Sequence, residues 1–168
     1  MNPKKYHTIV GEIISLLEKQ AIWFEKFEHE PVRTSEEAAQ IRTGYNLSQG
    51  AKALILRIKK TGKKDYFAQF VIPGNKRLNS RAVTEHLDAK SIRFATAEEL
   101  ATITSGIEAG GIPPFGNLFN IPVYFDIALL NQEKIIFNAG DRSFSIGMKA
   151  RDYLKIANPI IANFISQA

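Results

Sequence analysis

The chain has 168 residues, of which 45% are hydrophobic and 23% charged, a composition that excludes a disordered protein and suits one domain over residues 1–168. It contains no cysteine, which excludes disulfides, thiolate metal sites and a cysteine nucleophile. The net charge of +5, from 22 Lys and Arg against 17 Asp and Glu, favours encounter with a polyanion but does not identify one.

Hydrophobic periodicity and capping patterns predict helices and strands mixed along the chain. Helices are expected over residues 6–19, from Thr34, over 79–87, from Thr96 to about Thr102, over 149–157 and over 158–166. Strands are expected over residues 22–29, 52–59, 66–72, 91–95, 121–126, 134–140 and 143–148. Because the strands and helices lack regular βαβ spacing, we expect an α+β domain with a mixed central sheet and flanking helices.

Three local patterns mark helix starts. Thr34 with Glu37, and Thr96 with Glu99, have the spacing of a capping box. Asn158 followed by proline has the form of a cap and a first helical turn, which is why the last segment is expected to be helical.

The N-terminal apolar residues are interrupted by Glu12 and Ser15, so they suit neither a signal peptide nor a membrane span of about 20 residues. We therefore expect a cytoplasmic protein with no membrane partner.

The histidines and serines give no recognisable catalytic or metal signature. His7, His29 and His86 are too scattered for a metal motif, so we expect neither a metal nor another cofactor. His29 lies at a predicted strand end, where a structural hydrogen bond and a functional role are both open. No serine stands in a G-x-S-x-G elbow, so a Ser-His-Asp hydrolase is not supported.

The stretch GIEAGGIPPFG, residues 106–116, is the most distinctive loop. It lacks the Gly-Lys-Ser/Thr ending of a phosphate loop, but Gly110, Gly111 and Ile112 carry N–H groups and are followed by the φ-locked residues Pro113 and Pro114. Rigidly held N–H groups can bind a carbonyl oxygen that becomes negative during attack. A tight structural turn explains the same sequence.

Two further segments are candidates for a site. Lys52 begins a very apolar strand, where it can meet a phosphate or carboxylate at a cleft edge or simply be a solvated strand end. FNAGDRSFSI, residues 137–146, places Asn138 near a turn that is either a plain hairpin or the wall of a pocket.

The segments FEHEPVRTSEEAA, GAKALIL, GGIPPFG and FNAGDRSFSI, in this order, resemble the YbaK/ProX family of aminoacyl-tRNA deacylases, which is related to the prolyl-tRNA synthetase editing domain. The resemblance covers about residues 20–155 and implies a mixed α+β fold. Lys52 matches the lysine required for activity in that family, and Gly110 to Pro114 match its G-x-x-x-P loop. His29 matches a histidine common in the family. Ser145 stands where some members have aspartate, which departs from cysteinyl specificity. The combination of QGAKAL, IPPF, FNAG and DYLKIANP resembles the YeaK-like branch.

The resemblance implies a trans-editing hydrolase that cleaves the ester of mischarged tRNA carrying Ser or Thr, with Ala as a further candidate. Lys52 and the N–H groups of residues 110–112 are the expected catalytic groups. The expected substrate contacts are His29, Pro113, Pro114, Asn138 and Ser145. The expected partner is aminoacyl-tRNA, with an aminoacyl-tRNA synthetase as a further candidate and no DNA. Two alternatives stay open: a non-catalytic module that binds tRNA or protein, and a hydrolase of another small ester or amide.

Overall fold

The computed structural model describes residues 5–31, 34, 36–37 and 42–166. The helix expected from Thr34 lies mainly outside these residues, although Thr34 Oγ1 accepts the Glu37 N–H at 3.1 Å as the capping pattern predicts. In chain order the elements are α1 (Thr8–Lys19), β1 (Phe24–Glu28), η1 (Leu47–Gln49), β2 (Ala51–Lys59), β3 (Tyr66–Pro73), α3 (Ser80–Leu87), β4 (Ser91–Phe94), α4 (Ala97–Thr104), η2 (Gly116–Phe119), β5 (Val123–Asp126), η3 (Ile127–Asn131), β6 (Lys134–Asp141), β7 (Phe144–Lys149), α5 (Ala150–Ala157) and β8 (Ile160–Ala162).

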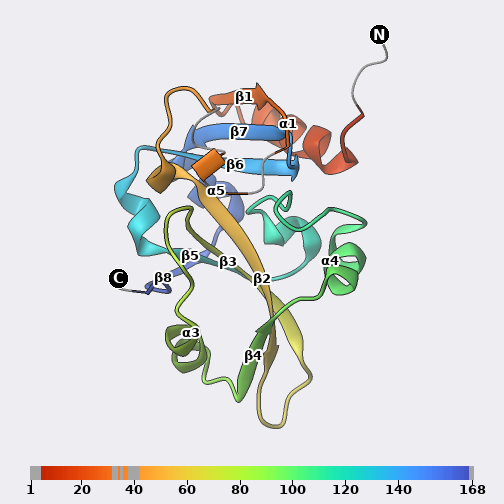
Figure 1. The fold of residues 1–168 in the computed structure, drawn as a ribbon, viewed down its shortest axis with the longest axis vertical. Coiled ribbons are helices and arrows are strands. Elements are labelled where there is room, and N and C mark those ends of the chain that lie inside the picture. The colour runs from red at the N-terminus through yellow and green to blue at the C-terminus, as the bar shows by residue number, and fades with distance from the viewer. Residues whose placement is uncertain (1–4, 32–33, 35, 38–41, 167–168) are drawn as a thin grey trace.

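The strands form two sheets, which confirms the α+β class: the expected mixed sheet is accompanied by a second, antiparallel sheet (Figure 1). One sheet is antiparallel with the order β1-β7-β6. The other is mixed, with the order β4-β2-β3-β5-β8, because β5 runs parallel to both β3 and β8. An isolated parallel bridge between Gly50 and Ile136 joins the start of β2 to β6. The two sheets therefore meet at the first residues of β2.

A hydrophobic core lies on each face of the five-stranded sheet. Side chains alternate along β2, so successive residues of this strand enter different cores. Ala51 and Ile55 face the larger core, which also takes residues from α1, α5 and the three-stranded sheet. Leu56 and Ile58 face a second core with α3 and the C-terminal segment. Ile112 of the glycine–proline loop belongs to the larger core, so packing between the sheets helps to place this loop.

The helix α4 begins with the capping box that the sequence predicts. Thr96 Oγ1 accepts the Glu99 N–H at 3.1 Å, and the Glu99 carboxylate accepts the Thr96 N–H at 2.9 Å. The same carboxylate accepts bonds from Arg93 and Arg57, at 2.7 and 2.9 Å, and these contacts, led by Arg93, hold the pKa of Glu99 well below its usual range. No helix in the described part of the chain is long and apolar enough to cross a membrane.

The prediction of a helix over residues 158–166 is wrong. Asn158 has φ +45° and closes α5 as its left-handed C-terminal residue, instead of opening a new helix. After Pro159, residues Ile160–Ala162 form β8, which pairs in parallel with β5. β-branched residues suit this edge position, and the N–H of Phe164 donates to the buried carboxylate of Asp126 at 2.6 Å.

Candidate functional site

Two polar side chains lie on the outer face of the three-stranded sheet, away from the larger core. Asn138 of β6 lies directly opposite Ser145 of β7. Their strand neighbours, such as Phe137 and Ile146, point into the larger core, so alternation turns Asn138 and Ser145 to the other face. His29 follows β1 and extends the ladder through its N–H, which donates to Ser143 O at 3.0 Å. The register of three strands thus aligns groups that are up to 116 residues apart in sequence.

Arg42 joins these groups into what we call the Arg42 network: His29, Arg42, Asn138 and Ser145. Arg42 donates from Nε to Ser145 Oγ at 3.0 Å and from Nη2 to Asn138 Oδ1 at 2.7 Å. Ser145 Oγ also lies 3.1 Å from Asn138 Oδ1 and 2.8 Å from His29 Nε2. The guanidinium therefore fixes both strand residues at once through its rigid fork of donors.

The positive charge of Arg42 is buried, and no carboxylate of the described residues pairs with it. Only 7% of the residue is exposed, and no acidic side chain in the described ranges lies within ion-pair distance of it. Burial lowers the pKa of Arg42 to about 10, so the group remains a cation at neutral pH. Among the described residues, the hydrogen bonds of Arg42 are accepted by the neutral oxygens of Ser145 and Asn138. These bonds persist only while both side chains keep their orientation.

His29 is oriented by its two ring nitrogens. Nδ1 donates to the carbonyl of Glu30 at 2.9 Å, because a carbonyl can only accept. In the neutral ring Nε2 is then an acceptor, and it lies with Asn138 Oδ1 within reach of the single hydroxyl proton of Ser145. His29 is thereby held at the edge of the Arg42 network, partly exposed to solvent.

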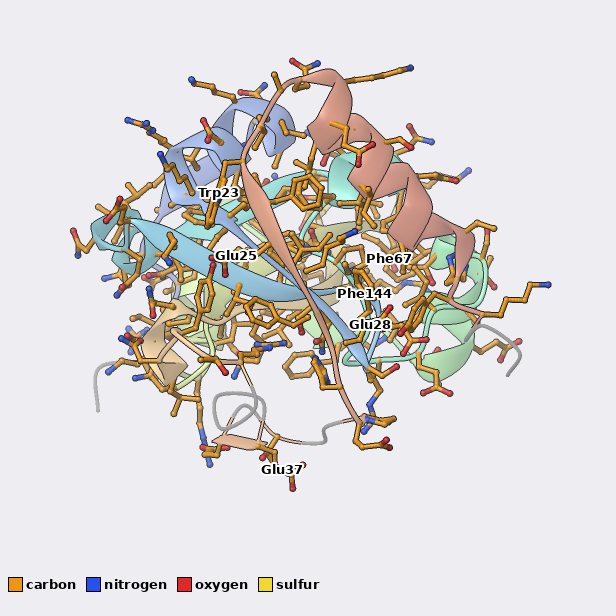
Figure 2. The ribbon with its side chains drawn as sticks, turned by 90° about the horizontal axis from the view of Figure 1, so that it is seen from above. Trp23, Glu25, Glu28, Glu37, Phe67 and Phe144 are labelled. Atoms are coloured by element: carbon orange, nitrogen blue, oxygen red, sulfur yellow. The ribbon has the colours of Figure 1, made fainter. Side chains whose placement is uncertain are left out.

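Tyr45 covers the same face farther along β7. Gly147 has no side chain, and a Cβ atom there would collide with the Tyr45 ring. The Tyr45 hydroxyl donates to Glu25 of β1 at 3.3 Å, and burial together with this carboxylate raises the pKa of Tyr45. Figure 2, seen from above, shows Glu25 on β1, an edge strand of the three-stranded sheet, with Glu37 beyond the end of β1. Tyr45 and Arg42 thus both close over the outer face of this sheet.

The glycine–proline loop is held by its carbonyl groups. Asn138 Nδ2 donates to Gly110 O at 2.6 Å, and the Gly140 N–H donates to Gly111 O at 2.8 Å. Two further carbonyls accept from fully buried side chains: Pro113 O from Gln69 Nε2 at 2.9 Å, and Pro114 O from the Tyr153 hydroxyl. Four acceptors of the loop are therefore used for anchoring, one of them by the Arg42 network.

The N–H groups of the loop, unlike its carbonyls, are only partly used in hydrogen bonds within the described protein. The Gly111 N–H donates to Glu108 O at 3.0 Å and closes a turn, so the expectation that it is a free donor is wrong. The N–H groups of Gly110 and Ile112 have no acceptor among the described residues. Since prolines have no N–H, Gly110 and Ile112 are the donors that the G-x-x-x-P segment can offer to a ligand.

Two glycines allow this geometry. Gly110 has φ +87°, a left-handed conformation that L side chains rarely adopt. Gly140 has φ +119°, and a Cβ atom there would collide with Ile9 of α1. The close approach of β6 to α1 and to the loop therefore requires glycine at position 140.

Lys52 lies at the junction of the two sheets. Its Nζ donates to Lys76 O at 2.8 Å, and it makes no hydrogen bond to the Arg42 network. Burial lowers the pKa of Lys52, and the nearby positive charge of Arg77 lowers it further, whereas the carboxylate of Glu36 acts in the opposite direction.

The bridge between Gly50 and Ile136 relates Lys52 to the network. Lys52 stands two residues beyond Gly50, and Asn138 stands two residues beyond Ile136, on strands that run in parallel there. By alternation both side chains turn away from the larger core, which takes Ala51 and Phe137 instead. Lys52 therefore lies beside the face that carries the network, without direct contact.

A hollow of about 700 Å³ borders the other side of the loop. It is lined by residues of the loop and of the β6–β7 turn, among them Glu108, Gly111 and Arg142. Lys52 and Asn138 are not among its lining residues. This hollow is therefore distinct from the face that carries Asn138 and Arg42.

Three of the expected substrate contacts are buried in this structure. Pro113 and Pro114 are buried, and Ser145 is 0% exposed, so none of them presents a surface to a substrate. Pro113 and Pro114 instead fix the loop, and Ser145 orients Arg42 and His29. Asn138 stays partly exposed while it holds Gly110.

Sequence reasoning missed Arg42, Gln69 and Tyr153. Arg42 lies in a segment without a clear periodic pattern, and its partners are set by the register of β6 and β7. Gln69, a polar residue within the apolar strand YFAQFVI, was a visible signal, because a buried amide needs partners. Within the described part of the chain, no group of three or more His, Asp or Glu side chains is arranged to hold a metal ion.

Comparison with known proteins places these features in a family. The family model described as "Aminoacyl-tRNA editing domain" matches residues 29–156. A Multifunctional Ser/Thr-tRNA deacylase, ProXp-y, of Escherichia coli (strain K12) is 31% identical over 153 residues, which cover 90% of each chain. A proline–tRNA ligase of Shouchella clausii is 29% identical over 124 residues, 72% of this chain and 20% of the ligase. The fold matches the crystal structure of a candidate trans-editing enzyme for prolyl-tRNA synthetase, with a TM-score of 0.79 at 22% identity over 97% of this chain and 100% of the other.

Proposed function

Because the chain belongs to the family of aminoacyl-tRNA editing domains and is a deacylase of that family, we propose that it hydrolyses mischarged tRNA that carries serine or threonine. Alanine is the next candidate. Support for this substrate class comes from the E. coli relative, which is named as a Ser/Thr-tRNA deacylase. A pocket that selects hydroxylated side chains suits editing, since one methylene group gives only about 1–3 kcal/mol of discrimination at a synthetic site.

The observation that carries the proposal is the loop that is anchored by its carbonyls and leaves two N–H groups unbonded within the described protein. We place the ester carbonyl oxygen of the substrate against the N–H groups of Gly110 and Ile112. Negative charge develops on that oxygen when water attacks, and fixed N–H donors stabilise it without reorganisation. The Arg42 network contributes indirectly, because Asn138 holds Gly110 through its carbonyl.

The reaction needs no protein nucleophile. Water adds its oxygen to the carbonyl carbon and loses a proton, and the tetrahedral intermediate then expels the ribose oxygen. The amino acid leaves as a carboxylate, and the ribose oxygen is protonated to a hydroxyl. The free neighbouring hydroxyl of the terminal ribose is well placed to assist the water. An aminoacyl ester is already activated compared with an amide, which is why oriented backbone donors suffice.

We assign to Lys52 the binding of a phosphate of the tRNA 3′ end, or the orientation of the ester itself. Its ammonium group, half-buried at the junction of the two sheets, supports this role. His29, partly exposed at the edge of the Arg42 network, is the substrate-contacting candidate on the opposite side of Asn138. The cytoplasm, with an aminoacyl-tRNA synthetase as a further partner, is the setting we propose for this activity.

The direct test is a panel of tRNAs charged with Ser, Thr, Ala, Cys and Pro. The release of each amino acid is measured with the wild type, Lys52→Ala and the control Lys19→Ala, which changes an exposed lysine at the end of α1. We expect release from seryl- and threonyl-tRNA, a loss of at least about tenfold in Lys52→Ala, and wild-type rates in the control. A protein that releases none of the five amino acids contradicts the proposed substrate class. Full activity of Lys52→Ala removes that residue from the site.

A further inference from the structure

The β2–β3 hairpin ends in a group of lysines that the proposed reaction does not use. Lys59, Lys60, Lys63 and Lys64 surround the turn, and Lys90 lies beside them because its N–H donates to Lys59 O at 2.8 Å. We call these five residues the hairpin lysines. In Figure 1 the hairpin projects at the end of the molecule opposite the three-stranded sheet.

The charge of the hairpin lysines is not compensated by neighbouring acids. Two acidic residues near the hairpin, Asp65 and Glu99, are bound by arginines: Asp65 by Arg57 at 3.1 Å, and Glu99 by Arg57 and Arg93 at 2.9 and 2.7 Å. None of the five lysines lies within ion-pair distance of an acid in the part of the chain that the structure describes. A concentration of unpaired positive charge attracts a polyanion.

The hairpin holds these charges in a fixed arrangement. The Lys63 N–H donates to Lys60 O at 3.3 Å, and Gly62 has φ +73°, so the chain turns tightly between the two lysines. β4 supports the base of the turn by pairing Ser91 with Lys59. The tip carries Thr61 and Gly62 and no aromatic side chain on which a base could stack. Lysines without stacking groups suit phosphate contacts, which position a nucleic acid without reading its sequence.

The position of the hairpin matches a substrate that is longer than its reacting end. Lys60, just past the end of β2, is eight positions after Lys52. At about 3.3 Å per residue this corresponds to about 26 Å. A tRNA carries its amino acid on a short single-stranded tail that continues into an RNA duplex. We propose that the hairpin lysines bind the phosphate backbone of this duplex while the tail reaches Lys52 and Gly110. The proposal rests on the proposed function for its substrate, but it concerns a separate surface.

The test compares the variant Lys60→Gln/Lys63→Gln/Lys64→Gln with the control Lys19→Gln/Arg151→Gln/Lys155→Gln, which removes the same charge from α1 and α5. Hydrolysis is measured on the charged tRNA that the wild type cleaves fastest, and on the aminoacylated 3′ tail alone. For full-length tRNA at about 0.15 M salt we expect the hairpin variant to raise KM about tenfold with kcat within about twofold. Its plot of log(kcat/KM) against log salt should be shallower by about 2. Hydrolysis of the isolated tail should not change.

Three results would overturn the proposal: an unchanged KM and salt slope in the hairpin variant, an equal effect in the control, or an equal effect on the isolated tail. The two proposals fail separately. If the wild type cleaves no charged tRNA, the same variants are compared by fluorescence anisotropy for the binding of uncharged tRNA. Equal affinities of wild type and hairpin variant would then reject the hairpin surface independently of catalysis.

Discussion

At the scale of single residues, Arg42 combines full charge, burial and neutral partners. It spans Ser145 and Asn138 with two different nitrogens, and Asn138 in turn holds the carbonyl of Gly110. Arg42 contacts none of the reacting atoms in the proposed mechanism, so it is a positioning residue. Its influence on the reaction passes through the orientation of one amide side chain.

The substitution Arg42→Lys tests this positioning role, because lysine keeps the charge but cannot bond both partners through a planar fork. We expect kcat to fall by about tenfold or more with KM within about threefold, and the free energy of unfolding to fall by about 1–3 kcal/mol as a buried acceptor loses its partner. Steady-state kinetics and urea titration measure both. Arg151→Lys, an exposed position, is the matched control. A variant that loses stability but keeps the wild-type kcat would confine Arg42 to a structural role.

Lys52 allows a prediction about pH. Burial lowers its pKa, so in the folded protein Lys52 loses its proton at a lower pH than an ordinary lysine with a pKa of 10.5. If its charge binds a phosphate, kcat/KM corrected for spontaneous ester hydrolysis should decline on the alkaline side below that value. Glu36→Gln removes a charge that raises the pKa of Lys52, so the decline should move to lower pH. Lys52→Arg should abolish it. An alkaline decline that persists in Lys52→Arg would assign the titration to another group.

At the scale of elements, local patterns predicted most boundaries because periodicity and caps act within one turn or strand. The α4 capping box and the strand pairs of the hairpins followed these patterns. The C-terminal segment did not, because Asn158 and Pro159 suit the end of one helix as well as the start of the next. The segment instead forms β8, because it pairs in parallel with the edge of β5, which is remote in sequence.

The carboxylate of Asp126 binds the segment that follows β8 to the end of β5. It is fully buried and accepts the Ala128 N–H at 2.9 Å and the Phe164 N–H at 2.6 Å. Asp126→Ala leaves both donors without their partner, so we expect the free energy of unfolding to fall by about 2–3 kcal/mol in urea titration. Asp126→Asn keeps an acceptor of the same shape, and the loss should be smaller. Equal stability of Asp126→Ala and the wild type would show that β8 is held by its apolar contacts alone.

At the scale of the whole molecule, the candidate site arises where the two sheets meet. The loop is anchored from both: Gln69 of the five-stranded sheet holds Pro113, and Asn138 of the three-stranded sheet holds Gly110. The loop itself was recognisable from its glycines and prolines. Which of its N–H groups are free was not, because that depends on carbonyl anchors supplied by side chains 28 to 44 positions away. For the same reason the sequence indicated three donors where the structure leaves two.

The central claim, that free backbone donors of the loop perform the catalysis, is tested most directly by replacing one amide N–H with an ester oxygen at Ile112, using isoleucine's α-hydroxy analogue. This change removes the donor and keeps the side chain. We expect kcat for seryl- or threonyl-tRNA to fall by about 10²–10³-fold with little change in KM, as for the loss of one oxyanion donor. The matched replacement at Gly111 removes an N–H that is already bonded to Glu108, so it should cost stability more than kcat. Wild-type kcat in the Ile112 ester, and in the equivalent Gly110 ester, would contradict the account.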